Sequence, residues 1–416
     1  MSLEAHVRVS SCKLSEEITL IRVDDRYNRF FEGVWSIPEG ITYNSYLVFG
    51  EDKVALLDTT RYGFADPFLE ELRRHVEPRD IDYLVVHHAE PDHTGALPQL
   101  LALAPRARVV GSPLARRIIE KTYGVSLSGR FTPTRSGYRL ELGGVSLVFE
   151  ATPWLHWPET IMSLMEPGAT LFSGDAWGSY GIPEGFTDRE AGLSRDYLRL
   201  MRKYFATVIG HYRRHVAAAL EKLSSSNWLQ GLKRIAPLHG LVFEDNVARV
   251  VDLYGRWSRG EPEEGNVVVI AASSYGIAGQ ALRETLAYLE EKGYSPEIYG
   301  FDSLDHSSYG DILGSLYDAE AIIVIASTYE DETPPTMQCL ASLVCSKAAN
   351  RQPTVIVGSY GWSGGGAKRL AEKLADCLDV RGVYEYPGGE LDTGKLYELL
   401  DRLGLSGKKQ ARREEG

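Results

Sequence analysis

The sequence predicts an α/β protein of two domains, and three observations carry this prediction. At 416 residues the chain is longer than one ordinary domain. Hydrophobic residues make up 44% of it and charged residues 25%, which is enough apolar material for two cores. The run RGEPEEG at 259–265 is polar and turn-rich, and it separates two regions with different patterns. We therefore expect domains at 1–260 and 265–405, followed by a charged tail at 406–416.

The first region mixes strands and helices. Apolar runs and turn residues predict, in order, a hairpin at 42–59 around a turn at 50–52, a helix at 66–76, a buried strand at 81–86, a helix at 95–104 and strands near 107–110, 145–150 and 170–173. Strands and helices are expected to keep alternating to about residue 257. This region should therefore form a mixed α/β domain.

The second region predicts a parallel sheet. Its strands, NVVVIAA (266–272), AIIVIAS (321–327) and TVIVGSY (354–360), are continuous and apolar, and a loop and a helical pattern follow each one. Strands of this kind are buried on both faces. The alternation of strand and helix therefore predicts a doubly wound sheet with helices on both sides.

The composition excludes several classes of function. The net charge of −12 argues against a general nucleic-acid binder, because such a protein needs a basic face for the phosphates. Because an acidic surface repels anions at long range, a macromolecular partner should be basic or should bind through a local surface patch. The N-terminal MSLEAHVRVS has no signal-peptide pattern, and no stretch of about 18 apolar residues could span a bilayer. We therefore expect a cytoplasmic protein that binds neither nucleic acid nor membrane.

The cysteines narrow the kind of metal site that the chain could build. They are Cys12, Cys339, Cys345 and Cys377, and no CxxC pair occurs among them. Four scattered thiols in so long a chain predict neither a disulfide framework nor a rubredoxin-type iron site. Any metal should therefore bind histidine and carboxylate ligands.

Residues 88–93, HAEPDH, carry the strongest chemical signal, because they place four potential ligands in a Pro-containing turn directly after the strand at 81–86. Three more potential ligands each end an apolar run: ATPWLHW, LFSGDAW and IAPLHG. Ends of strands bring side chains from distant parts of the chain to one rigid site. The sequence therefore predicts a dinuclear metal site formed by His88, Glu90, Asp92, His93, His156, Asp175 and His239.

Three other histidines are not expected to bind metal. Alternation at a strand end points His87 away from His88, so we assign His87 a structural or supporting role. His211 and His215 are four residues apart in HYRRHVAAALEKL, a spacing that can bind metal on a helix. That segment also carries a complete apolar stripe, so we interpret the pair as a solvated or packing feature.

Three loops of the second region follow apolar strands, at the edge where open α/β sheets bind ligands. SSYGIAG (273–279) lies between a strand and a helix, where backbone N–H groups and the helix N-terminus can hold a phosphate. Alone it is also compatible with an ordinary βα turn. STYEDETPP (327–335) and SYGWSGGG (359–366) follow the next two strands, and together the three loops favour a ligand site.

The order and spacing of these motifs resemble the metallo-β-lactamase fold and, more narrowly, the flavodiiron (type A flavoprotein) family. The shared motifs are H-x-E-x-D-H, HWPET, FSGDAWG and PLHG, with GITYNSYLV near the start, and the resemblance runs from about residue 30 to about residue 400. It implies an N-terminal metallo-β-lactamase-like αββα sandwich with a diiron site, followed by a C-terminal flavodoxin-like doubly wound parallel sheet that binds FMN. It also implies a head-to-tail homodimer.

By this resemblance, one iron takes His88, Glu90 and His156, the other takes Asp92, His93 and His239, and Asp175 bridges the two. Hydrolytic relatives of the fold hold zinc and carry a histidine at the position of Glu90. Three carboxylates suit iron that cycles between two oxidation states better than they suit zinc hydrolysis. Open positions on both metals would let O₂ or two NO molecules bind. We assign catalytic roles to Asp175 and Glu90.

The resemblance also implies flavin contacts. The loop at 359–366 lines the isoalloxazine ring, and Trp362 lies among glycines, where stacking on flavin is favoured over burial in a core. The expected FMN-binding residues are Ser273, Ser274, Tyr275, Gly276, Ile277, Ala278, Ser327, Thr328, Tyr329, Ser359, Tyr360, Gly361, Trp362 and Gly364.

The sequence departs from the family pattern at two places. Ile277 and Ala278 replace the Asn and Thr of the usual phosphate loop. Each lost hydrogen bond costs about 0.5–1.5 kcal/mol, so FMN binding should weaken without being lost. AWGSY follows Asp175 in place of the usual Phe-Gly-Gln-His run, and Phe205 replaces a second tyrosine. Such neighbours tune a metal site, so the choice between O₂ and NO stays open.

These implications predict an oxidoreductase that reduces O₂ to water, NO to N₂O, or both. FMN would pass electrons to the irons from an external carrier such as rubredoxin or a flavin reductase, because the chain has no CxxC pair and no GxGxxG motif. A dizinc hydrolase of a thioester or phosphoester, fused to a flavodoxin-like domain, is one alternative. A non-enzymatic electron carrier with a degenerate first domain is another, and the set of seven ligands argues against it.

Overall fold

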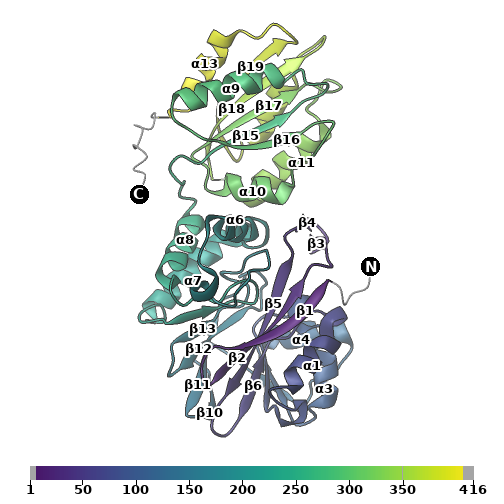
Figure 1. The fold of residues 1–416 in the computed structure, drawn as a ribbon, viewed down its shortest axis with the longest axis vertical. Helices are drawn as coiled ribbons and strands as arrows, with labels where there is room; N and C mark the ends of the chain where they lie inside the picture. The colour runs from purple at the N-terminus through teal and green to yellow at the C-terminus, as the bar shows by residue number, and fades with distance from the viewer. Residues whose placement is uncertain (1–5, 349, 406–416) are drawn as a thin grey trace. The chain divides into compact units, whose positions relative to one another are not determined.

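The computed structural model describes residues 6–348 and 350–405. The chain divides into two compact units, Met1–Arg259 and Gly260–Gly416, and each is described by itself (Figure 1). The charged tail expected at 406–416 lies outside the described residues. None of the helices within the described ranges is long and apolar enough to cross a membrane.

The first unit contains two main sheets. One has seven strands in the order β1-β2-β5-β6-β7-β8-β9, and the other has five in the order β10-β11-β12-β13-β14. The strands are β1 (Val7–Lys13), β2 (Ile18–Asp25), β5 (Ile41–Phe49), β6 (Val54–Leu57), β7 (Tyr83–Val86), β8 (Arg108–Gly111), β9 (Phe131–Pro133), β10 (Arg139–Gly143), β11 (Val145–Ala151), β12 (Ile161–Glu166), β13 (Thr170–Phe172) and β14 (Arg234–Ala236). A small hairpin joins β3 (Phe30–Phe31) to β4 (Trp35–Ser36).

The strand pairings confirm part of the sequence prediction and correct another part. The expected hairpin at 42–59 is the antiparallel pair β5–β6, with Tyr46 opposite Leu57. The expected alternation of strands and helices is wrong between β10 and β13, which follow one another without a helix. Gly143 and Gly144, both at positive φ, make the tight β10–β11 turn, and Gly168 does the same between β12 and β13. Short turns of this kind connect antiparallel strands.

Helices cover the outer sides of these two sheets. In Figure 1, α1, α3 and α4 lie along the first sheet, and α6, α7 and α8 lie on the side of the second. Between the sheets, Leu57 and Val85 of one pack in a single core with Phe149 and Phe172 of the other. The helices are α1 (Ala65–Arg73), α2 (Pro91–Thr94), α3 (Leu97–Leu103), α4 (Pro113–Tyr123), α5 (Asp188–Ala191), α6 (Arg195–Tyr204), α7 (Arg213–Ser225) and α8 (Val247–Arg259), with shorter turns η2 (Tyr62–Phe64), η3 (Pro78–Asp80), η4 (Phe205–Ile209) and η5 (Gly210–Tyr212). The predicted αββα sandwich is confirmed.

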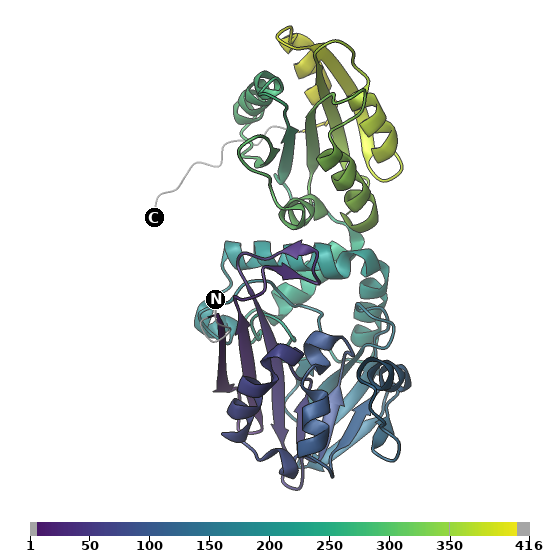
Figure 2. The same cartoon turned by 90° about the vertical axis from the view of Figure 1, so that its right-hand side faces the viewer.

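The second unit is one parallel sheet in the order β16-β15-β17-β18-β19. Its strands are β15 (Val267–Ala272), β16 (Glu297–Phe301), β17 (Ala321–Ser327), β18 (Pro353–Tyr360) and β19 (Asp379–Pro387), and its helices are α9 (Gly279–Glu291), α10 (Tyr309–Tyr317), α11 (Pro335–Leu343), η6 (Val344–Ala348), α12 (Gly366–Leu374) and α13 (Thr393–Asp401). Helices lie on both sides of the sheet in Figure 2. Numbered within the unit, this order is 2-1-3-4-5, the flavodoxin-like order. The predicted doubly wound sheet is confirmed.

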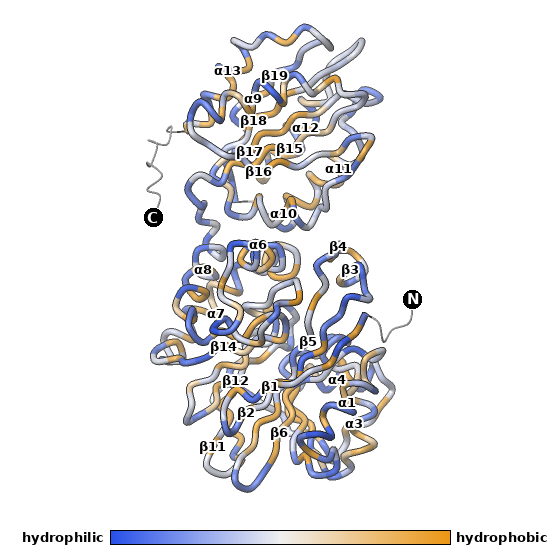
Figure 3. Tube along the Cα trace, in the orientation of Figure 1, coloured by the Kyte–Doolittle hydropathy of each residue, from blue (hydrophilic) through white to orange (hydrophobic). Residues whose placement is uncertain are grey.

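Both faces of this sheet are apolar, as the continuous strands predict. The central strands form hydrophobic segments of the trace in Figure 3. Val269 and Ile323 pack on the side of α9 and α13, with Leu289 and Leu396. On the other side, Leu316 of α10, Leu340 of α11 and Leu370 of α12 lie against Ile270 and Ile322.

One feature of the second unit was not predicted. Cys345 and Cys377 form a disulfide that joins η6 to the segment that follows α12, across 32 residues of sequence. Cys12 and Cys339 are free thiols. A single cross-link is not a disulfide framework, but the spacing of the cysteines gave no sign of it.

Candidate metal centre and cofactor loops

The seven expected ligands lie together at the ends of strands from both sheets. His88 and Glu90 follow β7, and Asp92 and His93 lie in the short α2 that comes next. His156 lies between β11 and β12, Asp175 follows β13, and His239 follows β14. The sandwich thus brings four separate stretches of chain into one pocket. Six of the seven side chains are buried, and Glu90 is nearly so.

The seven side chains form two groups, each with ligand atoms close enough to hold one ion. In the first group, His156 Nε2 lies 2.9 Å from Glu90 Oε2. His88 Nε2 lies 3.0 Å from the same oxygen. Asp175 Oδ2 closes this group at 3.0 Å from His156 Nε2.

The second group contains Asp92, His93 and His239. Asp92 Oδ2 lies 3.5 Å from His93 Nε2 and 3.6 Å from His239 Nε2. The other oxygen of Asp175, Oδ1, lies 2.9 Å from His93 Nε2 and 3.6 Å from His239 Nε2. Asp175 therefore presents one oxygen to each group.

The pocket has the unsatisfied polar atoms expected of a metal site. Both carboxylate oxygens of Asp92, and Nε2 of His239, are buried without a hydrogen-bond partner among the described residues. Buried polar groups are normally paired, because an unpaired one costs free energy. Imidazole nitrogens and carboxylate oxygens are ligands for iron and zinc. The donor set fits two divalent or trivalent cations.

The electrostatics of the pocket also favour bound cations. Burial opposes the charged form of His93, but Asp92 and Asp175 outweigh it and raise the pKa of His93 to about 9. Burial likewise opposes the charged form of His156, and Asp175 and Glu90 raise its pKa to about 9. The carboxylates therefore stabilise positive charge in the pocket, and bound metal ions would supply that charge.

In the second unit, the three expected loops lie at the carboxyl ends of β15, β17 and β18. They hold large apolar side chains that face solvent. Tyr275 is 95% exposed, Trp362 is 88% exposed, and Ile277 and Tyr329 are exposed as well. Exposed apolar groups that gather on one edge indicate a binding surface. A flat aromatic ligand fits this edge.

The first of these loops leaves polar groups available for a phosphate. The N–H groups of Tyr275 and Gly276 have no hydrogen-bond partner within the described residues. The hydroxyl of Ser273 accepts from Ala278 N at 3.1 Å and so holds the start of α9. In the second loop, Thr328 Oγ1 is buried and has no hydrogen-bond partner in the described part of the chain. These groups fit a phosphate-bearing cofactor at the point where the strand order reverses.

Comparisons with known proteins agree with this arrangement. The profile described as ODP family beta lactamase matches residues 41–240. A substituted form of the flavo di-iron protein of Thermotoga maritima is 32% identical, with a TM-score of 0.88 over 96% of this chain and 98% of that one. The chain belongs to the flavodiiron protein family. It is also 29% identical to a nitric oxide reductase of Moorella thermoacetica, over 89% of this chain and 92% of that protein. The rubredoxin:oxygen oxidoreductase of Desulfovibrio gigas is 25% identical, with a TM-score of 0.83 over 95% of this chain and 97% of that one.

Two groups that orient the ligands of this flavodiiron chain were not predicted. Glu159 Oε1 lies 2.9 Å from His88 Nδ1 and also accepts from Ala89 N at 2.9 Å. The main-chain oxygen of Thr42 lies 2.7 Å from His239 Nδ1. Such partners fix the ring and leave Nε2 free for a metal. Glu159 lies in the HWPET motif, three residues after His156, so the motif contained a signal for it.

The pKa of His239 supports this orientation. Burial lowers the pKa of His239 to about 4, so its ring is neutral near pH 7. Because the oxygen of Thr42 can only accept, Nδ1 carries the proton of the neutral ring. The lone pair of Nε2 therefore points toward Asp92 and Asp175.

The three histidines that were not expected to bind metal, His87, His211 and His215, lie outside the pocket. The Nδ1 of His87 lies 2.6 Å from Asp58 Oδ2, and its Nε2 lies 2.7 Å from Ser163 Oγ, which is a structural role. His211 lies in η5 and precedes α7, which begins at Arg213, so the helix that contains His215 does not include His211. Both are exposed, and His215 packs beside Trp154.

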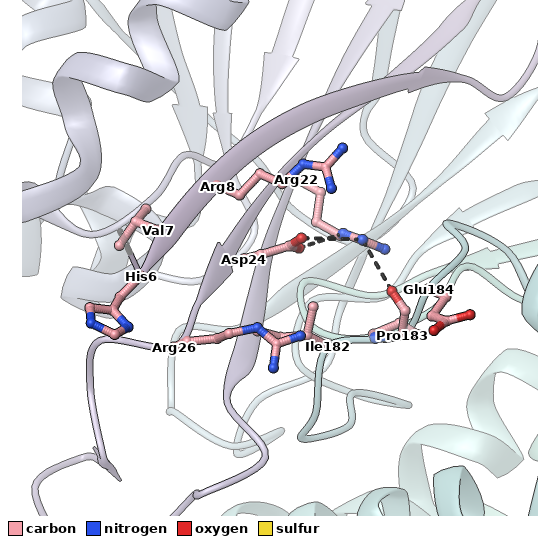
Figure 4. A pocket seen from close by; sticks show the side chains of 9 residues that line it. All are labelled: His6, Val7, Arg8, Arg22, Asp24, Arg26, Ile182, Pro183 and Glu184. Atoms are coloured by element: carbon pink, nitrogen blue, oxygen red, sulfur yellow. Dashed lines mark hydrogen bonds and ion pairs between the residues drawn. The ribbon is translucent and has the colours of Figure 1, made fainter. Parts of the chain in front are cut away.

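The loop that follows Asp175 is held by Arg22 of β2. Arg22 is paired with Asp24 at 2.7 Å, and it donates to the carbonyls of Gly185 at 2.6 Å and Pro183 at 3.2 Å. Figure 4 shows the bonds of Arg22 to Asp24 and Pro183 at the wall of a surface pocket of about 360 Å³, and none of the seven candidate ligands lines this pocket. Arg22 therefore holds the loop through two main-chain carbonyls, at a place apart from the candidate metal centre.

Proposed function

We propose that this flavodiiron chain is an oxidoreductase that reduces O₂ to water, NO to N₂O, or both, at a pair of irons. The observation that carries the proposal is Asp175, whose two carboxylate oxygens face different ligand groups. A carboxylate placed in this way can bridge two metal ions. The relatives named nitric oxide reductase and rubredoxin:oxygen oxidoreductase support the same activity.

We assign the metal ligands as two sets that share Asp175. One iron would be held by His88, Glu90 and His156, and the other by Asp92, His93 and His239. When bound, the irons supply redox electrons and open coordination positions for the substrate gas. Glu90 supports iron over zinc because a carboxylate is a harder, anionic ligand than the histidine that hydrolytic relatives carry at this position.

We assign FMN to the second unit, residues 265–405, and the diiron site to residues 1–260. The phosphate would lie on loop 273–278, with the N–H groups of Tyr275 and Gly276 directed to it. The ring would lie against Trp362 and Tyr329, beside 327–328 and 359–364. When bound, FMN supplies electrons that arrive from an external carrier. Ile277 and Ala278 offer no hydroxyl or amide to the phosphate, so the backbone carries that role.

Two partners complete the proposal. The first is an external electron donor, such as rubredoxin or a flavin reductase. The second unit has 25 Asp and Glu against 14 Lys and Arg, whereas the first has 32 against 31. A donor that docks at the second unit should therefore present a basic face. The second partner is another copy of the chain, in a head-to-tail homodimer that sets the flavin of one copy beside the irons of the other.

The test is metal and flavin analysis of protein produced with iron and riboflavin supplied, followed by gas consumption. We expect about two irons and one FMN per chain, and consumption of NO without oxygen, or of O₂ in air, when a reduced flavin donor is added. Purified protein that holds zinc and no flavin would contradict the proposal. Thioester or phosphoester hydrolysis by that protein would support the dizinc alternative.

A further inference from the structure

The β3–β4 hairpin presents two consecutive phenylalanines to opposite sides. Side chains alternate along a strand, so Phe30 and Phe31 of β3 point in opposite directions. Phe30 is 55% exposed, whereas Phe31 is 3% exposed. The hairpin therefore has one face in solvent and one face that inserts Phe31 into the first unit.

The inserted ring of Phe31 lies against a candidate metal ligand. Its centroid is 5.6 Å from that of His239, with the two rings perpendicular at 86°. It also lies 5.7 Å from the ring of Tyr180 and 6.3 Å from that of Tyr204. Tyr43 contacts His239 from another side at 5.5 Å. Edge-to-face contacts of this kind are directional and hold ring planes.

Both ends of the hairpin are fixed. Asp25 Oδ1 accepts from the N–H groups of Tyr27 and Asn28 at 2.9 and 3.0 Å. At the other end, Gly181 N donates to Gly40 O at 2.8 Å. Gly40 has φ +76°, and a Cβ there would lie 2.8 Å from Ile182 Cδ1, so no larger residue fits. The hairpin is therefore a built feature of the pocket and not an accidental loop.

A buried ion pair ties the hairpin to α6. Lys203 Nζ lies 2.6 Å from Glu39 Oε1, and the side chain of Lys203 is 1% exposed. Lys203 lies two residues before the π-helical segment η4, where Thr207 Oγ1 donates to the main-chain oxygen of Lys203 at 2.8 Å. Tyr180 OH lies 2.9 Å from the same Thr207 hydroxyl. A buried amine is strongly disfavoured without its partner, so the pair holds Glu39 and the adjoining hairpin in place.

We propose that the β3–β4 hairpin is the cover of the metal pocket on the His239 side, that Phe31 is a positioning residue for His239, and that Lys203–Glu39 holds the cover closed. This rests on the proposed metal site. The hydrogen bond to Thr42 fixes one atom of the imidazole, and the edge of Phe31 fixes its plane. Removal of that ring leaves a cavity beside the ligand, where the imidazole can turn and water can enter.

The test compares metal release from full-length variants loaded with cobalt(II), whose visible absorption reports the ligand field. Each sample is mixed with excess chelator and the absorption is followed. We expect Phe31→Ala to release metal at least about ten times faster than the natural chain, because substitutions beside metal ligands typically weaken metal binding by about tenfold or more. Phe30→Ala removes the same group from the exposed face of the same strand and should stay within about twofold. Lys203→Met should also speed release.

Further readings separate positioning from general stability. Thermal unfolding of the metal-free variants reports stability alone. Phe31→Leu keeps an apolar side chain in the cavity and should release metal at an intermediate rate, and it replaces the alanine variant if that one does not fold. Equal release rates for the natural chain, Phe31→Leu and Phe31→Ala overturn the proposal. A natural chain that binds no cobalt overturns the metal site itself, and the cover with it.

Discussion

The two candidate sites of this molecule are built in opposite ways. The metal pocket consists of seven polar side chains that two sheets bring together, with several of their atoms buried and unpaired. The cofactor loops consist of exposed aromatic side chains and free backbone N–H groups, and Tyr275 and Trp362 face solvent almost completely. The first site is complete in its ligands before anything binds. The cofactor site is an open edge of a sheet, and a bound ligand would cover its exposed side chains.

This difference determines how each site should respond to substitution. An unpaired buried charge is expensive, so loss of one ligand in the metal pocket affects all its neighbours. An exposed aromatic side chain contributes mainly apolar contact area, which is lost in proportion to the area. We therefore expect large, cooperative effects from the ligands of the metal pocket and small, additive ones from the exposed side chains of the cofactor loops. Four variants, one of them with two substitutions, test and sharpen this contrast.

The largest effect is expected from Asp175→Asn, because Asp175 faces both ligand groups. The binding free energy of a four-ligand structural zinc site is about 10–16 kcal/mol, or about 3 kcal/mol per ligand. Because Asp175 would be a ligand of both ions, its loss should reduce the total metal-binding free energy by about 6 kcal/mol. The variant should bind less than one metal ion per chain and lose turnover. Metal analysis measures the first effect, and flavin content, which should stay unchanged, is the internal control. Retention of both ions would contradict the bridging role.

The next effect belongs to the second unit alone and comes from its disulfide. Cys345→Ser with Cys377→Ser removes a cross-link that closes a loop of 32 residues. The chain-entropy estimate for a loop of this length is about 3–4 kcal/mol of stability. Denaturant unfolding followed by flavin fluorescence should shift by that amount, while metal content should not change. Cys339→Ser, which removes a free thiol, is the matched control. An equal shift in that control would mean that the cross-link is not the cause.

The sequence predicted the parts of both sites that lie at ends of apolar runs, because such positions carry a local signal. All seven residues of the pocket and all three loops are of this kind. The residues that orient the ligands were not predicted, since they act through contacts distant in sequence. The main-chain oxygen of Thr42 has no sequence signature, and the meeting of Phe31 with His239 depends on how two sheets pack. Likewise, the separation of Cys345 and Cys377 does not reveal their distance in space.

A smaller effect is expected beside the metal pocket from Glu159→Gln. The glutamine keeps an oxygen that can accept from His88 Nδ1 and Ala89 N but removes the charge that strengthens these bonds. Metal affinity should fall about tenfold, the low end of the range for partners of metal ligands. Competition with a chelator measures it. Glu141→Gln, on an exposed strand position, is the control and should leave affinity unchanged. An effect as large as that of Asp175→Asn would make Glu159 a ligand and not a supporting group.

The smallest effect is a gain in the phosphate loop, from Ala278→Ser. Ala278 is the N-cap residue of α9, and its side chain provides no cap hydrogen bond. A serine hydroxyl at an N-cap can accept from a backbone N–H of the first turn, but Ala278 is buried and has helical φ/ψ, so the gain in stability should stay below about 1 kcal/mol. If the hydroxyl instead donates to the phosphate, FMN binding should tighten by about 0.5–1.5 kcal/mol while the flavin-free stability stays constant. Fluorescence titration with FMN and unfolding of the flavin-free protein separate the two outcomes. Tighter FMN binding at constant stability would mean that the open edge binds the phosphate through side chains as well as the backbone. The difference between the cofactor loops and the metal pocket would then be one of degree.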